Sequence, residues 1–260
     1  MTPTLNRITI FPIKSLDGCD VDKVTVLANG ALANDRRYAL ADQGGKLVNG
    51  KQCVGIHSIR ATYDEDFRKV TLRQGEQFAT FLLPDEGEKL AAWCSKLLHK
   101  KCRFVENANE GFPDDCEAPG PTLISTASLT EVATWFDGID LAEVRRRFRM
   151  NLEIDSDVPF WEDQLIAENH NKIFRFQIGK IIWQGRGACQ RCIVPSRDSQ
   201  NGVVSSHFSK IFAKRRQDSL PGWAPTARFD HFYRLGVNTG LESVENGNTL
   251  RLGDPLCSLV

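Results

Sequence analysis

The chain has 260 residues, which is enough for one large domain or two ordinary ones with a core that needs no disulfide or metal. Lys plus Arg and Asp plus Glu both number 33, so the chain as a whole lacks the basic surface that binds nucleic acid polymers or anionic membranes. The first residues lack a secretory signal, and no apolar run is long enough for a membrane span. We therefore expect a cytoplasmic protein that binds no membrane.

The first hundred residues show the alternation of apolar and polar side chains that predicts short β-strands. Gly44–Gly45 and Gln74–Gly75 interrupt two of these runs at the positions where hairpins turn. Because so many short strands would leave open edges in a flat sheet, we expect them to curl into a small barrel or sandwich. The runs occupy residues 5–15, 21–27, 36–51 and 67–83.

Residues 87–100 have the periodicity of an amphipathic helix. Its apolar face consists of Leu90, Cys94, Leu97 and Leu98. The next stretch, 107–122, is acidic, contains Gly and Pro, and has few apolar residues, which is typical of a long loop or a boundary. We therefore divide the chain into two parts, 1–119 and 120–260.

Helical signals return after the boundary. Ser128 with Glu131, and Asp140 with Glu143, have the spacing of capping boxes, and Asp137–Gly138 is a stop signal between the two helices. An Asn246–Gly247 turn precedes one of the last strands. Strands are expected at 151–154, 172–183, 232–237, 248–253 and 256–260, and a short helix at 205–216. The chain is thus predicted to be mixed α/β and β-rich, with interspersed helices.

Cys189 and Cys192 are the one closely spaced cysteine pair. A structural zinc site would need two more ligands, and His207 has no partner nearby. A redox dithiol usually begins a helix, whereas Pro195 and a polar run follow here. The pair could also be accidental thiols, or one thiolate could bind a soft metal held mostly by a larger cofactor. We expect the remaining cysteines to be small buried hydrophobes: Cys19, Cys53, Cys94, Cys102, Cys116 and Cys257.

Several stretches, taken in order and with their spacing, resemble the MOSC family. They are "FPIKSLDG" (11–18), "NDRRYAL" (34–40), "LISTASL" (123–129), "RRFRMNLEI" (146–154), "PFWEDQL" (159–165) and "CQRC" (189–192). Within the family, the sequence is most similar to the mitochondrial amidoxime-reducing components and to bacterial proteins that reduce N-hydroxylated bases.

The resemblance implies an N-terminal MOSC β-barrel part and a MOSC β-barrel domain, with a molybdenum cofactor (Mo-molybdopterin) between them. Cys192 matches the family's metal ligand. Asp198 stays in register with the family pattern and either handles protons or shapes its loop. The positions that match residues holding the pterin and its phosphate are Lys14, Ser15, Arg36, Ser125, Thr126, Ser128, Arg149, Asn151 and Arg191. Arginine, lysine and helix N-termini all suit an anionic phosphate.

The function implied is the reduction of N-hydroxylated compounds such as hydroxylamino-purines, amidoximes and hydroxylamines. The partners would be the small-molecule substrate and an external flavin or iron–sulfur protein that supplies electrons, since the sequence has no GxGxxG unit and no CxxxxCxxC run. Two alternatives stay open. One is a cofactor carrier or sulfur-transfer module without turnover of its own, and the other is a non-catalytic module with structural cysteines.

The sequence departs from the family after Cys192, where "IVPSRDSQNG" replaces a run that usually begins with Thr. Near the end of the chain Phe232 stands where relatives carry an aromatic hydroxyl, with Tyr233 beside it. These changes concern the loop next to the expected metal and therefore bear on substrate preference. We expect Arg145, Arg146 and Arg147 to form a solvated or partly paired helix face.

Overall fold

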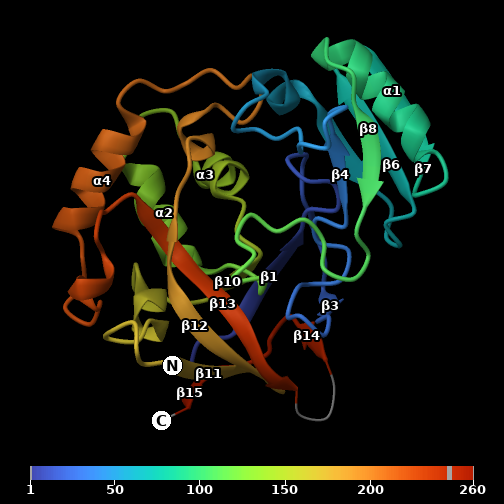
Figure 1. Cartoon of the computed structure of the whole chain (residues 1–260). Coiled ribbons are helices and arrows are strands. Elements are labelled where there is room, and N and C mark those ends of the chain that lie inside the picture. Colours follow the sequence, from blue (N-terminus) through green and yellow to red (C-terminus); the bar gives the residue numbers. More distant parts are fainter. Residues whose placement is uncertain (1, 245–247, 260) are drawn as a thin grey trace.

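The computed structural model describes residues 2–244 and 248–259, and the expected Asn246–Gly247 turn lies outside them. Within the described residues, strands from both halves of the chain alternate with four α-helices and four short 3-10 helices. The prediction of a β-rich, mixed α/β chain with interspersed helices is confirmed (Figure 1).

The strands are β1 (Leu5–Ile10), β2 (Cys19–Asp20), β3 (Lys23–Thr25), β4 (Tyr38–Ala41), β5 (Arg60–Tyr63), β6 (Lys69–Gln74), β7 (Gln77–Leu82), β8 (Arg103–Glu106), β9 (Leu123–Ser125), β10 (Leu152–Ile154), β11 (Phe174–Ile178), β12 (Ile181–Gln190), β13 (Arg234–Val244), β14 (Thr249–Arg251) and β15 (Leu256–Leu259). The α-helices are α1 (Gly87–Leu98), α2 (Thr126–Thr134), α3 (Leu141–Phe148) and α4 (Phe208–Asp218). The 3-10 helices are η1 (Val54–Ser58), η2 (Trp161–Leu165), η3 (Val194–Ser196) and η4 (Thr226–Arg228).

The largest sheet has eight strands in the order β15-β11-β12-β13-β9-β10-β1-β2. Only β9 and β10 run parallel among its described pairs. The edge strands β15 and β2 do not pair with each other, so over residues 2–244 and 248–259 this sheet stays open and does not close into the expected barrel. The segments that precede β1 and β15 meet in an isolated bridge between Thr4 and Pro255, which does not continue into a ladder between strands.

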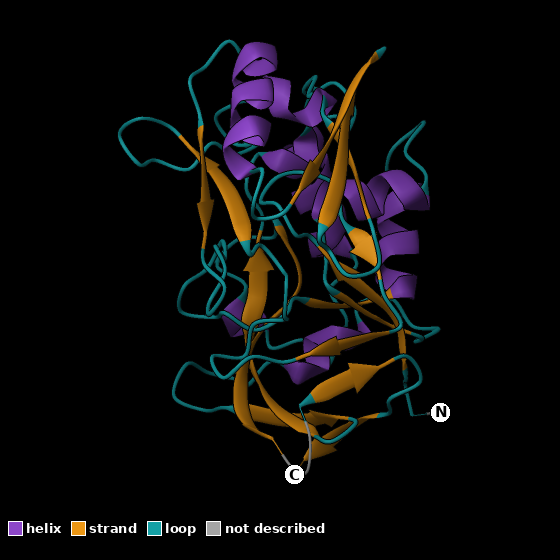
Figure 2. Cartoon of the chain, turned by 90° about the vertical axis from the view of Figure 1, so that its right-hand side faces the viewer, coloured by secondary structure: helices purple, strands orange, loops and turns teal. Residues whose placement is uncertain are grey.

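Strands from the two ends of the chain share sheets. Leu5 of β1 lies opposite Ile154 of β10, and β3 pairs with β14. Their apolar faces meet in one core in which Leu5, Trp183 and Leu250 are at most 1% exposed. The strands of this core fill the lower half of the view in Figure 2. The division at residues 119 and 120 stays a prediction.

The segment 38–106 forms the two- and three-stranded sheets that carry α1, at the upper right of Figure 1. The predicted hairpin at 67–83 is confirmed, with Thr71 opposite Thr80 and Gly75 in the turn at a φ of 56°. The hairpin predicted at 36–51 keeps its turn, but β4 pairs along its length with β8, a strand we did not predict.

The structure confirms one of the two predicted N-caps and corrects the other. Asp140 caps α3 by accepting a hydrogen bond from the Glu143 amide, as predicted. The box proposed at Ser128 is wrong, because α2 begins three residues earlier with Ser125 as its cap. Between residues 2 and 244, and between 248 and 259, no helix is both long and apolar enough to cross a membrane.

Candidate functional site

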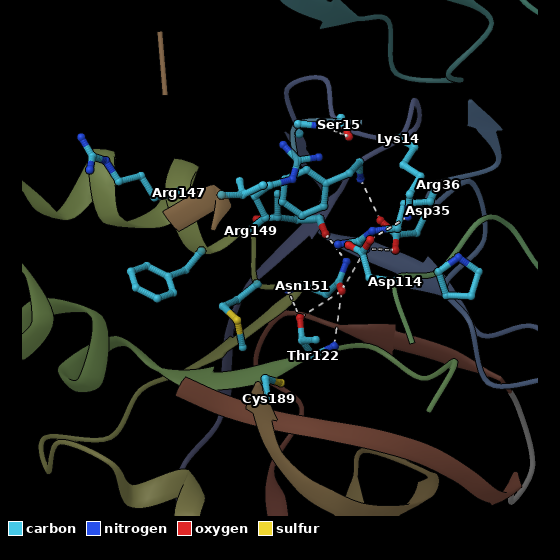
Figure 3. Close-up of a pocket in the computed structure, with 18 of the residues that line it drawn as sticks. Lys14, Ser15, Asp35, Arg36, Asp114, Thr122, Arg147, Arg149, Asn151 and Cys189 are labelled. Carbon is cyan, nitrogen blue, oxygen red and sulfur yellow. Dashed lines mark hydrogen bonds and ion pairs between the residues drawn. The ribbon is translucent and has the colours of Figure 1, made fainter. Parts of the chain in front are cut away.

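A cavity of about 640 Å³ opens where distant segments of the chain meet (Figure 3). Its wall comes mainly from residues 7–20, 35–60, 110–122, 145–153 and 189–199. The structure brings most of the predicted site residues to this one cavity: Lys14, Ser15, Arg36, Arg149, Asn151, Arg191 and Cys192. Lys14 and Ser15 follow β1, Arg149 and Asn151 lie between α3 and β10, and Arg191 and Cys192 follow β12, so the fold itself assembles the site.

Three lining residues adopt left-handed backbone conformations. Ser15, Arg36 and Arg149 have φ angles of 71°, 49° and 54°. A residue other than glycine in this region costs about 1–3 kcal/mol, and such strain concentrates where function needs a particular side-chain direction. At Arg149 the left-handed turn ends α3 and directs the chain into β10, which places the guanidinium over the cavity.

Lys14 is buried and already has partners. Its Nζ donates to the Phe112 carbonyl at 2.8 Å and to Asp114 Oδ1 at 2.9 Å. Burial lowers the pKa of Lys14. Burial alone would raise the pKa of Asp114, but Lys14, Arg36 and Lys51 outweigh it and hold that pKa well below its usual range. Asp114 belongs to an acidic strap, residues 113–117, whose first four residues line the cavity. Figure 3 shows the Asp114 side chain close to Lys14 and Arg36.

Asn151 fixes the position of Arg36. Its Oδ1 accepts hydrogen bonds from Arg36 Nη1 at 3.2 Å and from the Thr122 amide and hydroxyl, while its Nδ2 donates to the Thr9 carbonyl at 3.0 Å. Arg36 is also paired with Asp35. The amide of Asn151 is therefore occupied by its neighbours, and it orients Arg36 between β1 and the 120–122 turn.

Arg149 is a cation without a partner. Its guanidinium lies 4.2 Å from the centre of the Phe11 ring, and among the described residues it makes neither a hydrogen bond nor an ion pair. Burial, followed by the charge of Arg36, lowers the pKa of Arg149 to about 10. Arg149 is partly buried, and a charge in such a place is normally compensated by a counter-charge. An anion placed between Arg149, Arg36 and Lys14 would supply the missing partner, so the cavity is suited to a group with a phosphate.

The two cysteines of the pair have different surroundings. Cys189 is 3% exposed, its Sγ donates to Asn238 Oδ1, and burial raises its pKa to about 12. Cys192 lies just beyond the end of β12, is half-buried, and its Sγ accepts a hydrogen bond from the Val194 amide at 3.5 Å. Of the two sulfurs, that of Cys192 is better placed to act as a thiolate ligand.

Among the described residues, no three His, Cys, Asp or Glu side chains gather where they could share a metal ion. The other cysteines do not all fit the expected buried hydrophobe. Cys94 is buried, but Cys116 and Cys257 are exposed, and Cys116 lines the cavity from the acidic strap.

The hydroxyls at the start of α2 do not line the cavity. Ser125 and Ser128 share a hydrogen bond and are both bound to the buried Glu162, whose Oε2 accepts from the Ser125 amide and the Ser128 hydroxyl. Thr126 is bonded to Asn6 and Glu153 instead. The N-terminus of α2 is thus capped by Ser125, and the chain's own carboxylate, Glu162, already binds the two serines.

Asp198 also lies outside the cavity wall. Its Oδ1 accepts hydrogen bonds from the amides of Gln200 and Asn201 in its own loop. Of the two roles considered for it, this geometry favours shaping the loop. Arg145, Arg146 and Arg147 were expected on a solvated or partly paired helix face, and all three form ion pairs, with Glu153 or Glu143. Arg147 is not solvated, because its side chain is 4% exposed and lies 2.6 Å from Glu143.

Sequence reasoning missed part of the wall. His57, 8% exposed, lines the cavity with its Nε2 3.1 Å from the Gly50 carbonyl oxygen, and Arg60 and Arg197 line it nearby. Burial lowers the pKa of His57. The acidic strap was read as a boundary loop. The available signal was its cluster of acidic residues, which could have been predicted to lie against the predicted cofactor-binding cations Lys14, Arg36 and Arg149.

Comparison with known proteins agrees with this geometry. The profile of the MOSC N-terminal beta barrel domain matches residues 2–82, and that of the MOSC domain matches residues 122–256. The chain is 25% identical to mitochondrial amidoxime reducing component 2 of Bos taurus, over 99% of this chain and 83% of that protein. It is 23% identical to molybdenum cofactor sulfurase of Homo sapiens and 27% identical to that of Danio rerio, over 83% and 73% of this chain.

The chain spans 29% and 27% of the lengths of these two sulfurases, so the match concerns one part of each. The MOSC domain profile by itself covers just over half of the chain. On this ground the chain belongs to the MOSC family.

Proposed function

We propose that this protein is a molybdenum-cofactor-dependent reductase of N-hydroxylated compounds. The observation that carries the proposal is the cavity in which the unpaired Arg149 guanidinium lies beside Lys14 and Arg36 and which Cys192 also lines. A cofactor that combines an anionic phosphate with a thiolate-binding metal would satisfy both features. The likeness to an amidoxime reducing component over nearly the whole chain supports the reductase assignment.

In this proposal each residue of the site has a separate role. Lys14, Arg36 and Arg149 bind the phosphate through charge-assisted hydrogen bonds, each worth about 1.5–3 kcal/mol. Cys192 supplies a thiolate to the metal. When bound, the cofactor supplies a centre that can deliver two electrons. Asn151 keeps Arg36 in place. The hydroxyls of Ser125 and Ser128 bind within the chain and do not contact the cofactor.

The overall reaction converts R–NHOH, two electrons and two protons into R–NH₂ and water. The N–O bond breaks, the oxygen leaves as water, and the electrons come from an external flavin or iron–sulfur protein. Hydroxylamino-purines, amidoximes and hydroxylamines are the proposed substrates. His57 lines the cavity and is a candidate to hold a proton close to the reacting bond.

A carrier or sulfur-transfer role is the second candidate. It is favoured by the sulfurase relatives, whose matches cover much of this chain, and by the presence of Cys116, Cys189 and Cys192 around one cavity. A carrier would retain the cofactor without turning over a substrate.

The test is turnover of a hydroxylamino-purine by protein loaded with molybdenum, using a reduced viologen dye as the electron source. We expect turnover with the dye, and with NADPH plus a flavoprotein reductase, but none with NADPH alone. Loaded protein that gives no turnover even with the dye would favour the carrier role. Turnover with NADPH alone, in protein free of contaminating reductase, would show that the external-donor assignment is wrong.

A further inference from the structure

Three arginines of the cavity wall have no acidic partner. In the parts of the chain that the structure describes, Arg149, Arg191 and Arg197 form no ion pair, although all three line the cavity. Every other lysine or arginine of the wall is paired with an aspartate or glutamate, as Arg60 is with Asp17 at 3.4 Å. Because a cation withdrawn from water is normally compensated, the three unpaired arginines indicate where anionic ligands can bind.

Two of these arginines already have a role in the proposed function. Arg149 lies among the cations that would bind the cofactor's phosphate. Arg191 directly precedes Cys192, the proposed metal ligand. Burial raises the pKa of the Cys189 thiol, and the charge of Arg191 opposes that rise. Arg191 therefore acts on the sulfur side of the site, which leaves Arg197 as the arginine without an assigned anion.

Arg197 has hydrogen-bond donors to spare. The residue is half-buried, its Nη1 donates to the Gly202 carbonyl at 3.2 Å, and its Nε is buried with no partner among the described residues. The adjacent Asp198 does not compensate the charge, because its Oδ1 accepts from two amides of its own loop and its Oδ2 lies 3.8 Å from Arg147 Nη2. The guanidinium of Arg197 therefore keeps both charge and donors for a ligand.

The loop that carries Arg197 is held by its own hydrogen bonds. Arg197 and Val204 form an isolated β-bridge, the Asp198 amide donates to the Val203 carbonyl at 2.8 Å, and the Gly202 amide donates to the Asp198 carbonyl at 2.9 Å. A side chain presented from such a frame loses little conformational freedom when it binds a ligand, which favours selective recognition.

Arg197 faces a different part of the cavity from the cations assigned to the cofactor's phosphate. Burial lowers the pKa of His57, and among its charged neighbours Arg197 has the largest effect, ahead of Arg149 and Arg60. The pKa of Arg149 is lowered by burial and then by the charge of Arg36. Arg149 therefore faces Arg36, whereas Arg197 faces His57. A phosphate bound beside Arg149 and Arg36 would leave Arg197 open to a second anion.

We propose that Arg197 binds a phosphate carried by the substrate, and that the preferred substrate is a hydroxylamino-purine nucleotide rather than the free base. Arginine suits phosphate because its planar guanidinium can donate two parallel hydrogen bonds. Among the proposed substrate classes, the purines are those that take a phosphate as nucleotides, whereas simple amidoximes and hydroxylamines carry no strongly acidic group. The inference rests on the proposed function for the reaction at the N–OH group and adds the contact that selects the substrate.

The experiment measures binding of the amine products by calorimetry, apart from turnover. Adenosine monophosphate and adenosine are each titrated into the full-length protein purified with its molybdenum cofactor. Arg197→Gln removes the charge, and Arg197→Lys keeps it. Arg73→Gln is the matched control, because Arg73 is exposed on β6, lies over the Phe78 ring and is outside the cavity. Molybdenum content, and dye-driven turnover of hydroxylamino-purine as base and as nucleotide, are measured on all four proteins.

We expect the unmodified protein to bind adenosine monophosphate about tenfold more tightly than adenosine, which is the effect of one charge-assisted contact. Arg197→Gln should weaken binding of the nucleotide by about tenfold and change adenosine binding by less than about twofold. Arg197→Lys should bind the nucleotide within about threefold of the unmodified protein, and Arg73→Gln within about twofold. Molybdenum content should be the same in all four. In turnover, Arg197→Gln should raise KM for the nucleotide with little change in kcat.

The inference is overturned if the unmodified protein binds adenosine monophosphate no more tightly than adenosine, a comparison that needs no variant. It is also overturned if Arg197→Gln binds the nucleotide as tightly as the unmodified protein, or if folded Arg197→Gln loses molybdenum, which would assign Arg197 to the cofactor. If the preference for the nucleotide is present and Arg197→Gln removes it while no protein shows dye-driven turnover, the subsite stands and the proposed reductase function fails. Turnover of base and nucleotide with equal KM would support the reductase and exclude the subsite.

Discussion

Replacing Arg149 with Met should make the protein without cofactor more stable while weakening its affinity for phosphate. The guanidinium of Arg149 has no partner among the described residues, and burial lowers its pKa from 12.5 to about 10. A pKa depressed in the folded state means that the cation destabilises the fold at every pH below the folded value, including neutral pH. The shift corresponds to about 3 kcal/mol at 1.36 kcal/mol for each unit.

Part of that gain is offset. The contact of Arg149 with the Phe11 ring contributes about 0.5–2 kcal/mol, which the substitution removes. We therefore expect Arg149→Met to raise the free energy of unfolding by about 1–2.5 kcal/mol, or Tm by about 2–10 °C for a chain of this size. The unbranched methionine keeps much of the buried stem, so packing changes little.

The assay is thermal unfolding with and without pyrophosphate. Pyrophosphate should raise the Tm of the unmodified protein, because a ligand that binds the folded state stabilises it, and should raise that of Arg149→Met much less. Arg147→Met is the control: Arg147 is equally cationic but is paired with Glu143, so its loss should destabilise by about 2 kcal/mol or more. A lower Tm for Arg149→Met, or a Tm that rises with pyrophosphate as much as that of the unmodified protein, would refute the reasoning.

Other substitutions give three further tests. Cys192→Ser should abolish metal retention and dye-driven activity while Cys189→Ser keeps much of both, and equal complete loss in both variants would favour a two-cysteine metal site. Asp114→Asn should tighten pyrophosphate binding in calorimetry, since it frees Lys14 from its carboxylate; unchanged affinity would show that the strap does not compete with anions. Burial, followed by the charge of Asp163, raises the pKa of Glu162, so stability should be highest below its unfolded value and fall as pH rises through the folded one. Glu162→Gln should flatten that dependence in urea unfolding measured from about pH 5 to about pH 8, and an equally steep dependence in the variant would exclude Glu162 as its cause.

Local signals predicted the elements whose determinants lie close together in sequence. The hairpin at 67–83 and the Asp140 cap of α3 depend on neighbours within a few residues, and both are present. The cap of α2 was misplaced because Ser125 and Ser128 both fit the pattern, and the choice between them depends on Glu162, 34 or more residues away. The strand β8 was missed because it has four residues, and their extended conformation depends on pairing with β4, which is distant in sequence.

The site was predictable to a different degree for each residue. The family resemblance placed Lys14, Arg36, Arg149 and Cys192, and the structure brings all four to one cavity. No local pattern could show that Asp114 binds Lys14, because 100 residues separate them and the contact depends on the path of the acidic strap. The opposite error occurred at α2, whose hydroxyls fit an anion site by type but are bonded to a carboxylate of the chain itself.

The content of molybdenum in protein purified from a host that makes the cofactor tests the central claim most directly. The metal should be present at about one atom for each chain in the unmodified protein and in Cys189→Ser, and should be lost in Cys192→Ser, since Cys192 is the proposed ligand. Protein that contains zinc in place of molybdenum, or that keeps molybdenum in full after Cys192→Ser, would contradict the account.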